Sequence, residues 1–196
     1  MTKRLPPGPH LDLLLEALDA EAGAQRALLA GDVDSAHQMF DAASRRYRAS
    51  FECAPPASYG RLVGMLKAAV IAGDPDDAAE YARAAIGGAE PTPTAAYVEA
   101  LVALVTGDDD GAERAAAVMR GGDEPFGRAA DVVAALARHD GHGYRDACSA
   151  VVADFEARSE HLTGVPIADT AVMFESFAEA RGMACHPLSP LMPGSA

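Results

Sequence analysis

Six polar residues close to one predicted helix could take part in chemistry. Histidine, aspartate and glutamate side chains are ligands for zinc and manganese, and a metal-dependent enzyme would use His139, His142 and His161. His142 is expected at the start of the helix and His161 at its end, so about 27 Å of rise at ~1.5 Å per residue would separate them. We therefore favour a solvated polar turn, and we expect no metal site, no cofactor and no catalytic residue here. The residues concerned are Arg138, His139, Asp140, His142, Glu160 and His161.

Two pairs of glutamates have the spacing of one helical turn. Glu156 precedes Glu160 by four residues, and Glu175 precedes Glu179 in the same way. Paired carboxylates perform acid–base catalysis where burial raises one pKa, and nothing in the sequence indicates burial. We expect both pairs on solvated helix faces.

The cysteines give no sign of a disulfide framework or of a zinc motif. Cys53, Cys148 and Cys185 are odd in number, widely spaced and in no CxxC arrangement. His142 lies six residues before Cys148, too far along a helix to activate it. We expect reduced, buried thiols.

Charge and composition restrict the partners. The chain has 16 Lys and Arg against 29 Asp and Glu, a net charge of −13. Binding a phosphate backbone needs clustered cations, so nucleic acid is not expected as a partner, whereas a basic protein would be attracted. The start of the chain combines a short basic run with prolines, unlike a signal peptide or a membrane span. A cytoplasmic location without membrane contact is expected.

A recurring pattern predicts helical hairpins. An apolar helix, a Gly-Asp turn and a second helix with small residues occur three times, with the turns at Gly31, Gly73 and Gly107. Glycine allows the positive φ that ends a helix, and the aspartate that follows can cap the next one. A looser fourth copy offers Ala147. The alanines that stand five residues after the three glycines are Ala36, Ala78 and Ala112. The four alanines are spaced by 42, 34 and 35 residues, which is typical of stacked two-helix units.

The predicted architecture is all-α, with antiparallel hairpins stacked as an α-solenoid. We interpret residues 1–196 as a single helical-repeat domain, with hairpins over about 10–160 and a C-terminal helix and extended, proline-rich tail over 165–196. No sequence pattern sets an oligomeric state. The about nine expected helices run near 10–29, 33–50, 58–72, 75–87, 93–106, 109–120, 125–138, 143–160 and 168–181.

The second helix of the first hairpin resembles the tetratricopeptide repeat. Ala36, Phe40 and Ala43 match the small, bulky, small triplet of that family. The later hairpins carry smaller residues at the corresponding positions. The resemblance covers about residues 10–155 and implies a tetratricopeptide-like fold that binds other proteins.

The last 50 or so residues carry a second resemblance. An Ala-rich helix, Arg-Gly, a short extended segment and a Ser-Pro-containing tail are similar to the C-terminal end of the immunity protein 49 family of bacterial polymorphic toxin systems. This resemblance implies a cytoplasmic antidote that binds a cognate toxin and has no catalytic activity. The matching positions are His161, Ala171, Ala178, Arg181, Gly182, Ser189, Pro190 and Pro193.

We therefore expect a non-catalytic protein that binds and neutralises a cognate toxin, with a basic toxin domain as the partner that the charge favours. Two alternatives stay open: a general scaffold or regulatory adaptor of tetratricopeptide type, and the metal-dependent enzyme described above. Tyr59 and Tyr97 are expected early in the first helices of their hairpins, where tyrosines often anchor a partner. Acidic and polar turns could meet basic groups of that partner. The candidate partner-binding residues are Tyr59, Tyr97, Asp108, Asp109, Asp110, Asp140, His142, Glu160 and His161.

Overall fold

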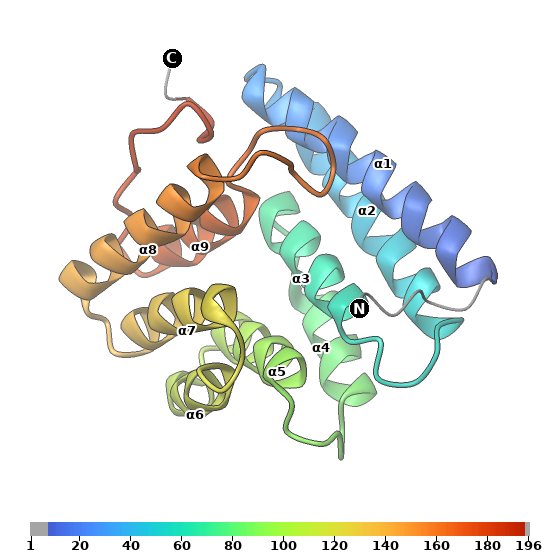
Figure 1. The fold of residues 1–196 in the computed structure, drawn as a ribbon, viewed down its shortest axis with the longest axis horizontal. Helices are drawn as coiled ribbons and strands as arrows, with labels where there is room; N and C mark the ends of the chain where they lie inside the picture. Colours follow the sequence, from blue (N-terminus) through green and yellow to red (C-terminus); the bar gives the residue numbers. More distant parts are fainter. Residues whose placement is uncertain (1–7, 195–196) are drawn as a thin grey trace.

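The computed structural model describes residues 8–194 and shows an all-α protein (Figure 1). The predicted fold class and the predicted number of helices are confirmed for this range. Most helix ends fall within two residues of the prediction, but the eighth helix ends four residues early, at Glu156. The helices are α1 (Pro9–Leu29), α2 (Val33–Glu52), α3 (Gly60–Ala72), α4 (Asp76–Ala85), α5 (Pro93–Thr106), α6 (Asp109–Met119), α7 (Glu124–Ala137), α8 (Gly141–Glu156) and α9 (Asp169–Ala180).

The three predicted glycine corners are present. Gly31, Gly73 and Gly107 have φ of 79°, 86° and 71°, in the left-handed region that glycine adopts without strain. At the first and third corners the following aspartate caps the next helix: Asp32 accepts a hydrogen bond from the Ser35 N–H, and Asp108 accepts one from the Gly111 N–H. Each corner reverses the chain between two helices.

The second corner differs from its prediction. Asp74 does not cap α4; Pro75 occupies the N-cap position without a side-chain hydrogen bond, and the helix begins at Asp76. Relative to its glycine, α4 therefore starts one residue later than α2 and α6. The shift places Ala79 in the core and leaves the predicted Ala78 only partly buried.

A fourth corner of the same design replaces the looser copy that the sequence indicated. His139 takes the place of glycine with φ of 52°, and Asp140 caps α8 by accepting from the Gly143 N–H at 2.9 Å. Five residues after His139 stands Tyr144, which is fully buried. Tyr144 therefore takes the buried position for which the looser copy offered Ala147, and Ala147 is partly buried against the core.

Small side chains let the helices pack closely. Ala36, Phe40 and Ala43 of α2 are fully buried, as the tetratricopeptide-like triplet requires. Among the first helices of the hairpins, α3 packs on α5 and α5 on α7. Alanine dominates the core over residues 95–137, and its short side chain allows helix axes to approach.

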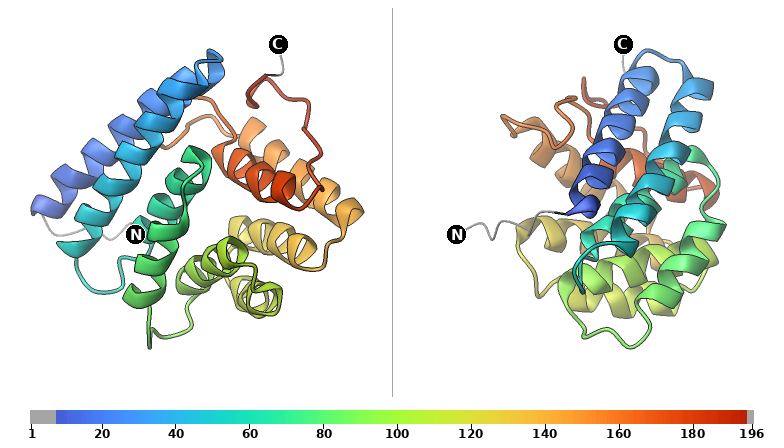
Figure 2. Two further views of the ribbon diagram at one scale, coloured as in Figure 1. Left: turned by 180° about the vertical axis from the view of Figure 1, so that it is seen from behind. Right: turned by 90° about the vertical axis from the view of Figure 1, so that its right-hand side faces the viewer.

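The C-terminal part of the chain returns to the N-terminal hairpins. Helix α9 packs against α3 as well as α7 and α8, and Figure 2 shows it beside the end of α3. The segment between α8 and α9 lies along α1 (Figure 1), where Val165 and Ile167 contact Ala22 in a small apolar cluster. The arrangement therefore closes on itself.

Between the end of α9 and residue 194 the tail contains no helix, as its prolines predict, and it lies over the last hairpin. The Ser189 hydroxyl donates to Glu156 at 2.7 Å, and the Leu191 carbonyl accepts from the Ala168 N–H at 2.9 Å. Met192 is buried. The tail is thus packed against the helices at Ser189 and Met192.

None of the helices in residues 8–194 combines the length and the hydropathy that crossing a membrane requires. The basic run at the start of the chain lies in residues 1–7, outside the described residues.

The corner at Gly73 gives a direct test of the hairpin design. We expect Gly73→Ala to lower the free energy of unfolding by about 1 kcal/mol, because a left-handed conformation is costly for alanine. A Cβ at Gly73 would meet no atom within 4 Å, so the loss would be conformational and not steric. Urea denaturation measures it. Gly127→Ala is the control: Gly127 lies within α7 without a positive φ and with open space around it, so this change should stabilise by about 0.5 kcal/mol. Equal effects of the two substitutions would contradict the interpretation.

Candidate functional site

Two adjoining hollows form one groove, which we call the central groove. The first has a volume of about 240 Å³ and lies between α3, α5, α7 and α8; the second, of about 630 Å³, lies between α1, α3, α5 and the loop after α2. Tyr97 of α5 lines both hollows, so it stands at their junction. The residues common to the two are Gly60, Val63, Thr94, Tyr97 and Thr170.

The wall of the smaller hollow is aromatic. Tyr97 and Phe126 meet edge to face with ring centroids 6.2 Å apart. Phe155 carries the Arg158 guanidinium over its ring at 3.8 Å and packs against the His161 ring. Such flat, rigid side chains provide contact area at low conformational entropy cost.

The charges around the smaller hollow are paired with one another. Arg128 lies 2.5 Å from both Glu124 and Asp154, and Asp154 also accepts from Arg158 at 2.5 Å. These two cations and two anions balance. The hollow therefore presents an apolar surface with a neutral polar edge.

Beneath the larger hollow lies a buried ion network. The Lys67 ammonium is 2.7 Å from Glu21 Oε1 and 2.5 Å from Asp169 Oδ2, and only 13% of its side chain is exposed. The Tyr47 hydroxyl donates to Glu21 at 2.5 Å, and Gln25 donates to Asp169 at 3.1 Å. The network joins α1, α2, α3 and α9.

The pKa shifts in the network keep Lys67 and Tyr47 protonated at neutral pH. Burial alone would lower the pKa of Lys67, but Asp169 and Glu21 outweigh burial and raise it well above its ordinary value. Burial, followed by the Glu21 charge, raises the pKa of Tyr47; burial likewise raises that of Tyr97. At neutral pH Lys67 is a charged ammonium without a lone pair, so it cannot act as a nucleophile or a base.

Only some of the predicted partner-binding residues lie in the groove. Tyr97 does, whereas Tyr59 stacks on Phe51 at 6.5 Å and does not line either hollow. Asp108 serves as the cap of α6, and Asp109 lies 3.0 Å from His139 and 3.6 Å from Arg181. Asp110 and Glu160 are exposed, away from both hollows, and Asp140 caps α8.

The three histidines of the metal hypothesis do not meet. His139 pairs with Asp109 at the corner before α8, and His142 is 83% exposed near Asp146. His161 follows the end of α8 and stacks on Phe155. Because α8 ends at Glu156, Glu160 also leaves the helix, and the predicted Glu156–Glu160 helical pair is wrong.

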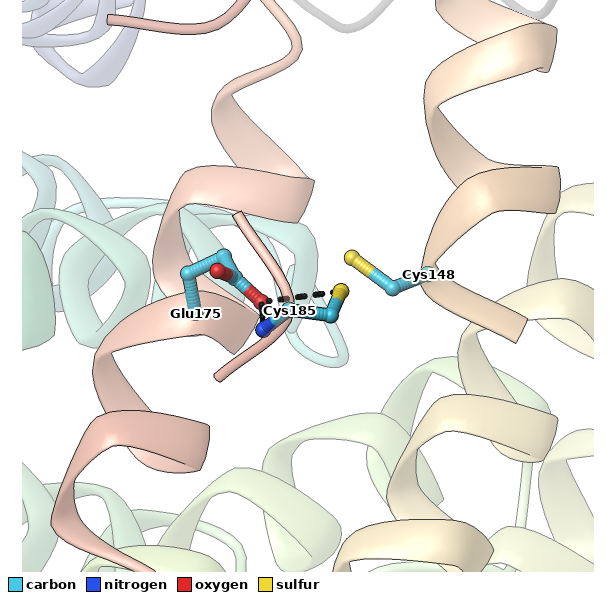
Figure 3. Close-up of side chains that lie close together, drawn as sticks. All are labelled: Cys148, Glu175 and Cys185. Atoms are coloured by element: carbon cyan, nitrogen blue, oxygen red, sulfur yellow. Dashed lines mark hydrogen bonds between the residues drawn. The ribbon is translucent and has the colours of Figure 1, made fainter. Parts of the chain in front are cut away.

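A cluster of two thiols and one carboxylate was not predicted. Cys148 of α8, Glu175 of α9 and Cys185 of the tail point toward one another (Figure 3), with their ligand atoms all within 4.8 Å. The expectation of a solvated Glu175–Glu179 face is wrong for Glu175, which is 6% exposed. The expectation of buried thiols fits Cys148 but not Cys53, which is exposed.

Hydrogen bonds fix the carboxylate of this cluster. The Tyr144 hydroxyl donates to Glu175 Oε1 at 2.5 Å, the Cys185 N–H donates to the same oxygen, and the His186 N–H donates to Oε2 at 2.7 Å. Burial raises the pKa of the Cys148 thiol; burial, followed by Cys148 and Glu175, raises that of Cys185 to about 12. Because both pKa values are raised, both thiols stay protonated at neutral pH.

No family model, no curated protein and no solved structure matches this chain.

Removing the Lys67 charge tests the ion network. We expect Lys67→Gln to lower the free energy of unfolding by about 3 to 5 kcal/mol, because two buried carboxylates lose their cation. Arg120→Gln is the matched control, since the Arg120–Asp131 pair is about half exposed and should contribute under about 1 kcal/mol. Chemical denaturation of both variants provides the comparison. Similar losses would show that Lys67 does not hold the network together.

The raised pKa values predict alkaline unfolding. Groups whose folded pKa is raised bind protons more tightly when folded, so their stabilising contribution is complete below their ordinary pKa and declines above it. The ordinary values are 10.0 for Tyr47 and Tyr97 and 10.5 for Lys67. The free energy of unfolding should fall above pH ~10 by about 1.4 kcal/mol per pH unit for each such group. Urea titrations from about pH 8 to about pH 11 measure the slope, which Tyr97→Phe should reduce. A flat profile would contradict the assignment.

Proposed function

We propose that this protein binds another protein through the central groove, and that the partner is a basic toxin domain which it neutralises in the cytoplasm. The observation that carries the proposal is that the two hollows meet at Tyr97 and so form one continuous groove. The volumes of its two parts are about 240 Å³ and 630 Å³. Such a groove suits side chains of a folded partner or of an inserted loop.

The chemistry of the groove supports binding in preference to catalysis. Of the cations that line it, Lys67, Arg128 and Arg158 are each held by carboxylates within 2.7 Å. The fourth, Arg61, is buried and donates to the Ser50 hydroxyl at 2.8 Å. Cations satisfied in this way offer little to a reacting substrate, whereas the aromatic and aliphatic walls offer area for an apolar anchor. Tyr97 would then be the central contact.

The charge of the whole chain supports a basic partner. At a net charge of −13, the surface would accelerate encounter with a cationic domain and make the association rate fall with salt. Asp110 and Glu160 are exposed and remain available for contacts at the edges of an interface. Within the described residues, Asp108 and Asp140 serve instead as helix caps.

The C-terminal resemblance to immunity protein 49 supports the toxin as the kind of partner. Several of its matching positions contribute to packing here: Ala171 and Ala178 are fully buried, Arg181 donates to the Leu104 carbonyl at 3.1 Å, and Ser189 donates to Glu156. The stacked hairpins further support a tetratricopeptide-like binding architecture.

A substitution that fills the groove tests the proposal. Thr94 lines both hollows at the start of α5 and is partly exposed. We expect Thr94→Arg to weaken binding to the toxin encoded next to this gene at least about 100-fold, because a long cation would occupy the groove and repel a basic partner. Calorimetry measures the affinity, and survival on co-expression measures protection.

Ser149→Arg is the matched control. Ser149 lies exposed on α8 and lines neither hollow, so the same gain of charge should leave affinity within about threefold. Wild-type protein that binds the neighbouring product without protecting the cell would point to the adaptor alternative. Unchanged binding by folded Thr94→Arg would place the interface elsewhere.

A further inference from the structure

The thiols and carboxylate of Cys148, Glu175 and Cys185 come from three separate elements and converge on one point (Figure 3). Cys185 Sγ lies 3.4 Å from Glu175 Oε1, and the three candidate ligand atoms lie within 4.8 Å of one another. Ligand atoms around a tetrahedral zinc ion, with bonds of about 2.0 to 2.3 Å, are separated by about 3.5 to 3.8 Å. The observed spacing therefore needs only a small contraction to surround an ion.

The charge of the cluster favours a cation. Glu175 is buried, and its carboxylate accepts hydrogen bonds from Tyr144 and from two backbone N–H groups. Within the described residues its ion-pair partner is His186, whose Nδ1 is 3.4 Å away; neither lysine nor arginine pairs with it. A buried negative charge without a full counter-charge is costly.

The outer contacts are those of a supported metal ligand. Tyr144 and the backbone at residues 185 and 186 fix the orientation of the Glu175 carboxylate. Metal-binding carboxylates are held by such hydrogen bonds. The His186 ring is 75% exposed, so it can turn toward the cluster.

We propose that Cys148, Glu175 and Cys185 bind one divalent transition-metal ion, for which two thiolates and a carboxylate select zinc, with His186 or water as the fourth ligand. On binding, each thiol releases its proton to solvent as the sulfur–metal bond forms. The ion would tie the tail to α8 and α9. The proposal does not depend on the proposed function, because its measurements need no partner.

Metal analysis of the reduced full-length protein is the test. After incubation with zinc and gel filtration, we expect about one zinc per chain, and a melting temperature at least about 5 °C above that of the chelator-treated protein. Cobalt in place of zinc should give the near-ultraviolet absorption of thiolate-to-cobalt charge transfer. Cys185→Ala should lose the bound zinc and halve or abolish that absorption.

Cys53→Ser is the matched control, because Cys53 is exposed and does not belong to the cluster of Cys148, Glu175 and Cys185. It should bind zinc as the wild type does. Cys185→Ala keeps a testable fold, since Cys185 is only partly buried in the tail. Zinc binding that is equal in Cys185→Ala and wild type, or absent in the reduced wild type, would overturn the proposal. A disulfide between Cys148 and Cys185 that remains after treatment with a reducing agent would also overturn the proposal.

Discussion

The ion network around Lys67 is the interaction on which the closed arrangement depends. Lys67 lies near the middle of α3, Glu21 in α1 and Asp169 at the start of α9, so one ammonium joins residues separated by up to 148 positions. Burying these charges is favourable only when all of them are satisfied together. The C-terminal helix must therefore sit against α3, and Thr170, next to Asp169, becomes part of the groove.

Closure explains why short helices with small side chains can form a stable structure. Alanine contributes little buried area per residue, so an open row of Ala-rich hairpins would have weakly held ends. Here the first hairpin is covered by the segment from Thr163 to Ile167, and the last by the tail. The C-terminal part of the described chain thus covers both the first and the last hairpin, and the groove has walls from both halves.

The local features of the fold could be predicted from the sequence, whereas its long-range contacts could not. Gly31 and Gly107 are each followed by an aspartate. The glycine conformation and the hydrogen bond of the aspartate specify a corner, and each involves residues only a few positions apart in the sequence. At His139 the same rule applied, but the corner lacked glycine and the register was misjudged. Tyr97 lines the groove, whereas Tyr59, expected on the same argument from helix position, stacks on Phe51. Glu21, Lys67 and Glu175 looked like ordinary surface residues, since only the return of α9 and the tail buries them.

The distribution of these buried polar groups along α9 separates structural from binding residues. Asp169 at its start joins the Lys67 network, and Glu175, six residues later, faces the two cysteines. The start and the middle of the helix are therefore held by different neighbours, which leaves it little freedom to adapt to a partner. The C-terminal segment, where the immunity protein resemblance lies, accordingly contributes to the packing of the fold. Under the proposed function, recognition of the partner would belong to the walls of the groove, where Val63, Thr94 and Phe126 belong to neither buried cluster.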